Sequence, residues 1–290
     1  MDCYRHRSFS LNTEATQRIA MVVEFDGRFY HGWQKQDNAT SAQATLETAL
    51  QNLEARPIKT ICAGRTDSGV HAEAMLVHAD VSQARWQRSA RAYTQGINHQ
   101  IKEGLAVTGV LPVEDDFHAR FSCIERSYRY QIWNRTTPSV LAPWRHWWMP
   151  RPINLEAMQE AAQYLLGTHD FTSFRASHCQ AHTAIRTINH IDMVRQGWEI
   201  HINISANAFL YHMVRNIMGN LIQVGIGRWS PQQLAGILAA QDRKQAAATA
   251  PARGLYFTNA RYPNFSSKDW VGKEWKGVSP SSVADTNTPS

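Results

Sequence analysis

A dense set of reactive side chains occupies one short stretch, CAGRTDSGVHA, residues 62–72. Arg65 stands two residues before Asp67, and Gly69 and His71 follow closely. Asp and Gly suit a surface turn because they tolerate its backbone geometry, but a turn does not require an arginine beside the aspartate. A carboxylate kept ionised by a neighbouring cation can act as a nucleophile or a general base. The local pattern therefore leaves a structural turn and a reaction centre both open.

A metal site is disfavoured by the same residues. No further carboxylate follows Asp67 until Glu73, and Arg65 would compete with a metal ion for the carboxylate. The four cysteines are far apart and form no CxxC pair. The segment SHCQAH, residues 177–182, lacks a second ligand pair at zinc-site spacing, so we interpret it as a polar loop with incidental histidines. We expect no bound metal.

A second candidate segment, DDFHARFSCIERSYRYQIWN, covers residues 115–134. It puts Tyr128 and Tyr130 on one face of an expected strand, between Arg126 and Arg129. A tyrosine on a sheet can stack on a nucleic-acid base, and its hydroxyl can move a proton. Ordinary core packing is the simpler interpretation of a strand tyrosine, and we adopt it for Tyr130.

The charge of the chain is consistent with an anionic partner. The formal net charge is +6, and 23 of the 30 cationic residues are arginine, which binds phosphate in a bidentate manner and stacks on bases. In ARWQRSARAY, Arg85, Arg88 and Arg91 would share one side of a helix. A solvated helix face explains that segment taken alone. Together with the total charge, these arginines become candidate RNA contacts.

The elements that must position these residues follow the order β-α-β-β-α-β twice. In the first half, the patterns predict a helix that Pro57 ends, a second helix over 84–98, and strands over 18–26, 58–63, 74–81 and 105–110. In the second half they predict helices over 154–166 and 208–225, and strands over 126–134, 186–194, 198–205 and 254–260.

This order is typical of an α+β protein with two ferredoxin-like halves. We place the halves at residues 18–112 and 113–263, joined into one mainly antiparallel sheet with a central cleft. Residues 1–17 and 264–290 are expected to be disordered tails; the second is rich in Ser, Thr, Pro and Asn. No apolar stretch is long enough for a membrane helix and no signal peptide is evident, so we expect a cytoplasmic protein.

The chain resembles the TruA-type tRNA pseudouridine synthases from about residue 18 to 263. The stretches that carry the resemblance are EFDGRFYHGWQKQ, CAGRTDSGVHA, DDFHARFS, RSYRYQIWN, LLGTHDFTSFRA, NAFLYHMVRNIMGNLIQVG and ARGLYF. GRTDSGVHA is highly specific for this family. The resemblance implies the pseudouridine synthase fold, with a basic cleft at its centre.

The resemblance also implies a reaction, the isomerisation of uridine to pseudouridine in the anticodon stem-loop of tRNA, at positions 38 to 40. Asp67 matches the catalytic aspartate and Tyr128 the active-site tyrosine. Arg65 matches the arginine that pairs with this aspartate and holds the flipped nucleotide, and Arg215 falls on a segment that lines the cleft. The family needs no cofactor and acts as a homodimer, with one tRNA touching both subunits.

Two departures from the family pattern concern RNA contacts more than chemistry. Ala74 and Met75 stand where Gly-Gln is usual, and GINHQIKEGLAV lacks a common Leu-Pro-x-Asp-Ile. The alternative function is a non-catalytic RNA-binding protein, or a tRNA chaperone, on the same fold. The presence of Arg65, Asp67 and Tyr128 together favours an enzyme, because a pure binder has no need of an Arg-x-Asp pair.

Overall fold

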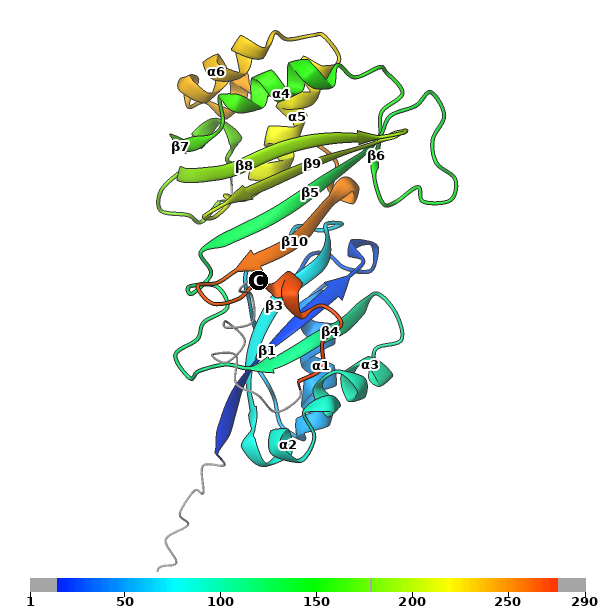
Figure 1. The fold of residues 1–290 in the computed structure, drawn as a ribbon, viewed down its shortest axis with the longest axis vertical. Coiled ribbons are helices and arrows are strands. Elements are labelled where there is room, and N and C mark those ends of the chain that lie inside the picture. Colours follow the sequence, from blue (N-terminus) through cyan, green and yellow to red (C-terminus); the bar gives the residue numbers. More distant parts are fainter. Residues whose placement is uncertain (1–14, 178, 276–290) are drawn as a thin grey trace, which may run out of the picture.

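The computed structural model describes residues 15–177 and 179–275. A ten-stranded sheet runs along the molecule, and helices cover it separately at each end (Figure 1). Its strand order is β4-β1-β3-β10-β5-β9-β8-β7, with β2 paired to β3 and β6 to β5. All strand pairs are antiparallel except β3 with β10 and β5 with β6. The expected α+β architecture is confirmed.

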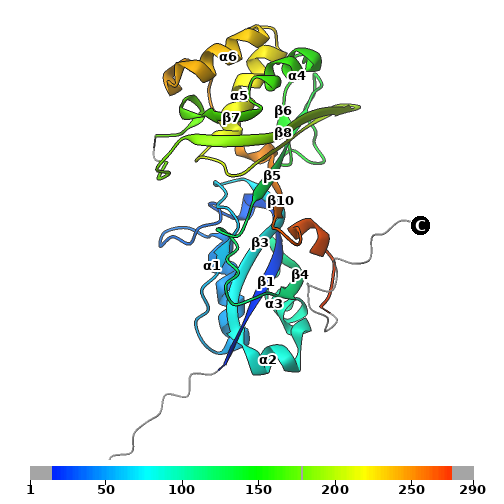
Figure 2. The ribbon, with the colours of Figure 1, turned by 60° about the vertical axis from the view of Figure 1, so that its left-hand side comes forward.

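The N-terminal half contains four strands, namely β1 (Thr16–Phe25), β2 (Ile61–Cys62), β3 (His71–Ser82) and β4 (Leu105–Pro112). Its helices are α1 (Ala42–Glu54), α2 (Gln83–Arg88) and α3 (Gln95–Gln100). Most of β1 and β3 is buried, because α1 covers one side of these strands and a short 3-10 helix, Ser267–Trp270, covers the other (Figure 2).

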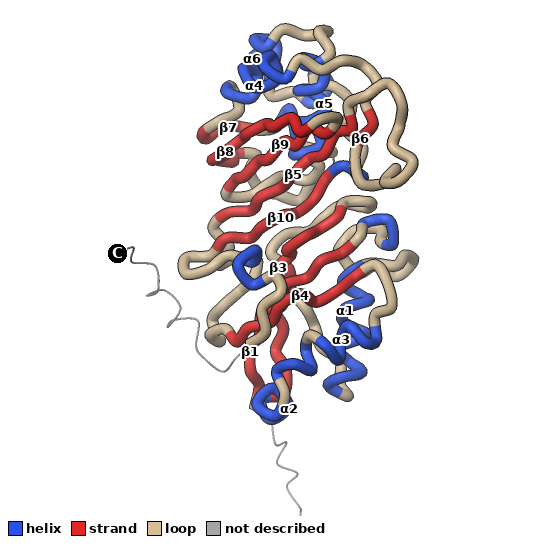
Figure 3. The backbone as a smooth tube through the Cα atoms, turned by 45° about the vertical axis from the view of Figure 1, so that its right-hand side comes forward, coloured by secondary structure: helices blue, strands red, loops and turns tan. Residues whose placement is uncertain are grey.

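The C-terminal half contains β5 (Glu125–Trp133), β6 (Trp147–Trp148), β7 (Gly167–Asp170), β8 (Ile185–Gln196), β9 (Glu199–Ala206) and β10 (Leu255–Arg261). Helices α4 (Leu155–Gln163), α5 (Met213–Gly225) and α6 (Pro231–Ala240) gather beyond these strands (Figure 3). Strands β8 and β9 form the predicted hairpin, in which Gly197 adopts a φ of +60°.

The two halves meet at β10. On one side Tyr256 and Phe257 pair in parallel with His71 and Ala72 of β3, and on the other side β10 pairs antiparallel with β5. Strand β2 is only two residues long and pairs with β3 at residues 77 and 78. The start of β3 is therefore left for β10 to pair with. The sheet therefore passes without a break from one half to the other.

Two predictions about the chain outside the main strands were wrong. The helix expected over 84–98 is interrupted at Ser89, whose φ of −162° is extended. The expected disordered tail, 264–290, contains the 3-10 helix, in which Ser267 is fully buried and donates its hydroxyl to the Ala74 carbonyl. Strand β1 also begins inside the other expected tail, 1–17; residues 1–14 and 276–290 lie outside the described residues.

Within residues 15–177 and 179–275, no helix combines the length and apolar character needed to cross a membrane. The division into halves at residues 112 and 113 stays a prediction, because β10 makes the sheet continuous.

Candidate active site

Asp67 is the first residue of a tight turn that leads into β3. The Val70 N–H donates to the Asp67 carbonyl at 3.1 Å, and Gly69, third in the turn, has a φ of +80°. A positive φ at that position is typical of a type II turn and favours glycine. The two strands expected around this stretch are therefore correctly joined by a turn, although β3 begins earlier than predicted, at His71.

Two glycines of the stretch EFDGRFYHG press against this turn. A Cβ added at Gly27 would lie 2.5 Å from the Val70 carbonyl oxygen, and one added at Gly32 would lie 2.7 Å from that of Thr66. Gly32 also has a φ of +90°, and the neighbouring Trp33 N–H donates to the Thr66 carbonyl. The backbone of this loop thus supports the turn at a distance that only glycine permits.

His71 fixes the turn from its other end. Its Nδ1 accepts from the Gly27 N–H at 3.1 Å, so Nε2 carries the proton and donates to the Trp144 carbonyl at 3.2 Å. The ring stacks on Tyr256 of β10, with centroids 4.7 Å apart. Burial lowers the pKa of His71 despite the opposing charge of Asp26, so the imidazole is neutral. His71 has a structural role here.

The charge partner of Asp67 is Arg215, at the start of α5. Arg215 Nη1 lies 3.0 Å from Asp67 Oδ2, and both side chains are mostly buried. Arg215 Nε donates to the Ala250 carbonyl at 2.9 Å, which orients the guanidinium. The expected pairing of Asp67 with Arg65 is wrong: Arg65 is exposed, and within residues 15–177 and 179–275 it forms no ion pair.

His212 is a second neighbour of Asp67. Its Nε2 lies 3.4 Å from Asp67 Oδ2, and its backbone is left-handed, with a φ of +61°. Burial lowers the pKa of His212, while the Asp67 carboxylate acts in the opposite direction. The ring therefore approaches the carboxylate as a neutral imidazole. Its signal in the sequence was its place three residues before Arg215, in YHMVR.

Tyr128 lies on β5 with its ring between two phenylalanines. Phe209 and Phe257 meet it edge to face, at centroid distances of 5.1 and 5.2 Å. Its side chain lies near the segment that leads to Asp67, since a Cβ at Gly64 would be 3.9 Å from the Tyr128 hydroxyl. Burial and then the Asp67 charge raise the pKa of Tyr128, so the hydroxyl keeps its proton at neutral pH.

Tyr130 belongs to the core, as expected. It is fully buried, and its hydroxyl donates to the Pro251 carbonyl at 2.6 Å.

Comparisons with known proteins identify the family of this chain. A family model described as tRNA pseudouridine synthase matches residues 161–263. A protein from Bartonella tribocorum named tRNA pseudouridine synthase A is 42% identical over 84% of this chain and 99% of its own. Proteins of the same name from Colwellia psychrerythraea and Rhodospirillum centenum are 44% and 45% identical, over 85% of this chain and 94% and 100% of theirs. The chain belongs to the tRNA pseudouridine synthase A family.

A chain in a solved structure titled Cbf5-Nop10-Gar1 complex aligns with 82% of this chain and 48% of its own length, at 11% identity and a TM-score of 0.35. This similarity is too low to support a conclusion about this chain. Family membership confirms both the resemblance found in the sequence and the expectation of an enzyme, an isomerase.

Arg126 connects several segments around Tyr128 by hydrogen bonds, and it was not identified from the sequence as a site residue. Its guanidinium donates to the Ala63 carbonyl, just before the Asp67 turn, and to the Asn207 carbonyl at 2.7 Å in the other half. It also donates to the carbonyls of Arg120 and Cys123. One side chain thus connects three segments beside Tyr128. The sequence offered its place two residues before Tyr128 as a signal.

The arginines at 85, 88 and 91 lie far from the Asp67 turn. They belong to α2 and the 3-10 helix Ala90–Tyr93, at the end of the molecule remote from β10 (Figure 1). The break at Ser89 prevents the single helical face that was expected. Arg85 approaches the buried Glu54 at 3.7 Å, and Arg91 pairs with Glu274 at 2.9 Å.

The described residues of this synthase hold no group of three or more His, Cys, Asp or Glu side chains that could bind a metal ion. His178 of the SHCQAH segment lies outside them. The site as described is therefore a carboxylate, its guanidinium partner, an imidazole and a phenol, which is a set suited to nucleophilic or acid–base chemistry.

Proposed function

We propose that this synthase converts uridine to pseudouridine in the anticodon stem-loop of tRNA, at positions 38, 39 and 40, with Asp67 as the catalytic carboxylate. The observation that carries the proposal is the Asp67 carboxylate, held by Arg215 on a turn that β3, the Gly27 loop and His71 fix in place. The names of the relatives support tRNA as the substrate.

The reaction explains the residue types. A uridine in a stem is stacked and must be extruded, at a cost of a few kcal/mol. The bond between N1 and C1′ then breaks, the uracil turns, C5 joins C1′, and the proton on C5 moves to N1. No electron is gained or lost, so the isomerisation needs no redox cofactor. Asp67 either attacks C1′ or assists glycal formation; both routes use an ionised carboxylate.

We assign a role in this scheme to each of Arg215, Tyr128 and Arg65. Arg215 balances its charge and fixes the direction of its oxygen. Tyr128 offers its ring to the uracil and its hydroxyl to the proton transfer. Arg65 is exposed and unpaired among the described residues, so its guanidinium is available to hold the extruded nucleotide or its phosphate.

Of the three remote arginines, Arg88 is the one that forms no ion pair within the described chain. We therefore retain Arg88 as the candidate RNA contact at that end of the molecule.

We further propose that the synthase acts as a homodimer in the cytoplasm, with one tRNA touching both subunits. Most of the affinity then comes from arginine and lysine contacts to phosphate.

The deciding experiment is to incubate unmodified tRNA with the protein and map pseudouridine by chemical probing. The parent should form it at positions 38 to 40, also after exhaustive chelation, and Asp67→Asn should form none while binding tRNA nearly as tightly. Asp37→Asn removes the same charge from an exposed loop and should keep full activity. A melting curve shows that each variant is folded. A folded Asp67→Asn protein that still makes pseudouridine at the parent rate would reduce Asp67 to a turn residue.

A further inference from the structure

Phe121 is a large apolar side chain that the fold leaves outside. It is 78% exposed, on the loop that connects β4 to β5. A single exposed apolar residue is common on protein surfaces. This one differs because the loop around it is ordered by several specific contacts.

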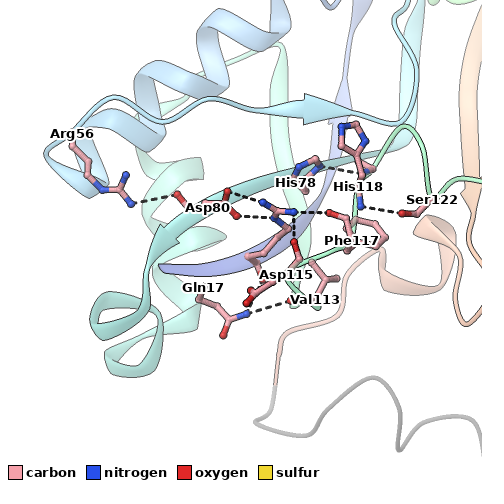
Figure 4. Close-up of polar contacts among 11 residues, drawn as sticks. Gln17, Arg56, His78, Asp80, Val113, Asp115, Phe117, His118 and Ser122 are labelled. Atoms are coloured by element: carbon pink, nitrogen blue, oxygen red, sulfur yellow. Dashed lines mark hydrogen bonds and ion pairs between the residues drawn. The ribbon is translucent and has the colours of Figure 1, made fainter. Parts of the chain in front are cut away.

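The loop holds the Phe121 ring in a defined position. The ring stacks on His118, with centroids 4.3 Å apart and an interplanar angle of 27°. His118 Nδ1 accepts from the backbone N–H groups of both Arg120 and Phe121. The Ser122 hydroxyl accepts from the His118 N–H at 3.0 Å (Figure 4). His118 in turn packs against His78 of β3. One face of the Phe121 ring is thus supported, and little of the ring is covered.

Arg126 places this loop beside the catalytic segment. The same guanidinium donates to the carbonyls of Arg120 and of Ala63, four residues before Asp67. Arg65 lies two residues after Ala63 on that segment. Phe121 therefore stands beside the Arg120 guanidinium, on a loop that Arg126 connects to the segment containing Arg65.

Neither of these cations is neutralised by the protein. Arg65 and Arg120 are exposed, and within residues 15–177 and 179–275 neither forms an ion pair. The Arg120 guanidinium lies 5.8 Å from the centroid of the Phe121 ring. An exposed ring with an unpaired cation over it complements a ligand that has a flat apolar surface and negative charge. An unpaired nucleotide of an RNA loop has both.

We propose that Phe121 and Arg120 form a stacking platform for one unpaired base of the RNA loop next to the target uridine. The base stacks on the exposed surface of the Phe121 ring, and the Arg120 guanidinium, which lies over that ring, contacts its phosphate. The platform thereby sets which nucleotide of the loop reaches Asp67. This inference rests on the proposed function, since the RNA is the one on which Asp67 acts.

The test is a double-mutant cycle between Phe121 and the loop nucleotides. Binding of an anticodon stem-loop RNA is measured in the Asp67→Asn background, so that no turnover occurs. Each loop nucleotide is replaced in turn by an abasic one. Phe121→Leu should weaken binding of the intact RNA roughly tenfold, as the loss of one stacked base does, whereas Phe121→Trp should not. At the loop position whose base stacks on Phe121, the abasic RNA should bind Phe121→Leu and its parent with equal affinity, because the base that the ring contacts is already missing.

The matched control is Trp198→Leu, which removes an aromatic ring that is 58% exposed at the distant β8–β9 turn. It should leave binding unchanged. Equal binding of the intact RNA by Phe121→Leu and its parent would overturn the platform. So would a cycle in which, at every loop position, the losses of binding free energy from Phe121→Leu and from the abasic nucleotide are additive. A Phe121→Leu variant that sediments at a lower mass than the parent would also overturn the platform, because it would show that the ring contacts a second copy of the chain. A parent that binds with the expected cycle but makes no pseudouridine contradicts the proposed reaction and leaves the platform standing.

Discussion

Tyr128 has a ring that is tightly held and a hydroxyl that stays protonated. The edge-to-face contacts with Phe209 and Phe257 fix the plane of the ring. Burial and the Asp67 charge raise the pKa of Tyr128, so its hydroxyl carries a proton at neutral pH. The hydroxyl can therefore accept a proton during the reaction only if it releases its own. Ring and hydroxyl thus make separable contributions.

We expect Tyr128→Phe to lower kcat roughly 10²- to 10⁴-fold, which is the usual contribution of a positioned proton-transfer group, with little change in KM. Tyr128→Leu should also raise KM, because stacking is worth roughly 1–3 kcal/mol per base. Both constants come from initial rates of pseudouridine formation over a range of tRNA concentrations. A Phe variant as active as the parent would remove the proton-transfer role and leave only stacking.

The sequence located Asp67 and Tyr128 but assigned the wrong cation to Asp67. Arg65 is two residues away in the chain, yet its side chain leaves the turn toward solvent. Arg215 is 148 residues away and reaches the carboxylate because α5 begins beside the turn. Local spacing cannot reveal such a pair, since it depends on how the two halves join. His212 and Arg126 were missed for the same reason.

At the level of elements, the loop with Gly27 and Gly32 is what holds the Asp67 turn at its position. We expect Gly27→Ala to destabilise the fold by about 1–3 kcal/mol, because its Cβ would overlap the Val70 carbonyl and force the backbone to shift. A displacement of the turn by about 1 Å should also lower activity roughly 10²-fold. Urea unfolding and turnover measure the two effects.

The control for this variant is Gly236→Ala in α6, where an added Cβ meets nothing within 4 Å. It should stabilise the helix by about 0.5–1 kcal/mol and leave turnover unchanged. Equal stability and activity of Gly27→Ala and the parent would show that the loop adapts and does not support the turn rigidly.

A buried histidine makes the docking of the β4–β5 loop sensitive to pH. His78 Nδ1 accepts from the Ala119 N–H at 3.1 Å (Figure 4), and protonation would abolish that acceptor. Burial, and then the charge of Arg18, lower the pKa of His78 from 6.5 to about 4. The unfolded chain binds this proton first, so the contribution to stability is present above pH 6.5 and is lost as the pH falls toward 4.

This shift corresponds to a loss on the order of 3 kcal/mol over that pH range. We expect the free energy of unfolding, measured in urea at a series of pH values, to fall from pH 6.5 to 4. His78→Asn keeps an acceptor for Ala119 but does not titrate there, so its curve should be flatter. Parallel curves for the two proteins would contradict the role of His78.

Most elements were predictable because their apolar residues repeat at the period of a strand or helix. The exception at 84–98 has a physical cause. Trp86, Tyr93 and Ile97 are all buried, at spacings of seven and four residues that continue a helical pattern across the break at Ser89. The strand expected over 58–63 is shorter because the Thr60 N–H donates to the Glu47 carboxylate instead of joining the sheet.

At the scale of the whole molecule, the main prediction is the oligomeric state. We expect sedimentation at working concentrations to show about twice the chain mass of 32.9 kDa, because the sequence resemblance implies a homodimer. Dilution series with and without tRNA would separate a stable dimer from one that RNA assembles. A monomer with full activity at all concentrations would contradict the proposal.

Strand β10 lies at the middle of the sheet, between β3 and β5, although along the chain it is the last of the strands that the structure describes. Until residues 255–261 emerge, a nascent chain has nothing to pair with β3 at His71 and Ala72 or with the facing edge of β5. Asp67 and Arg215 are both synthesised by then, yet the strand that brings their two halves into register is still missing. The sheet that joins the two halves therefore cannot form before residues 255–261 have been synthesised, and a product that stops before β10 contains both groups without the strand that connects their halves.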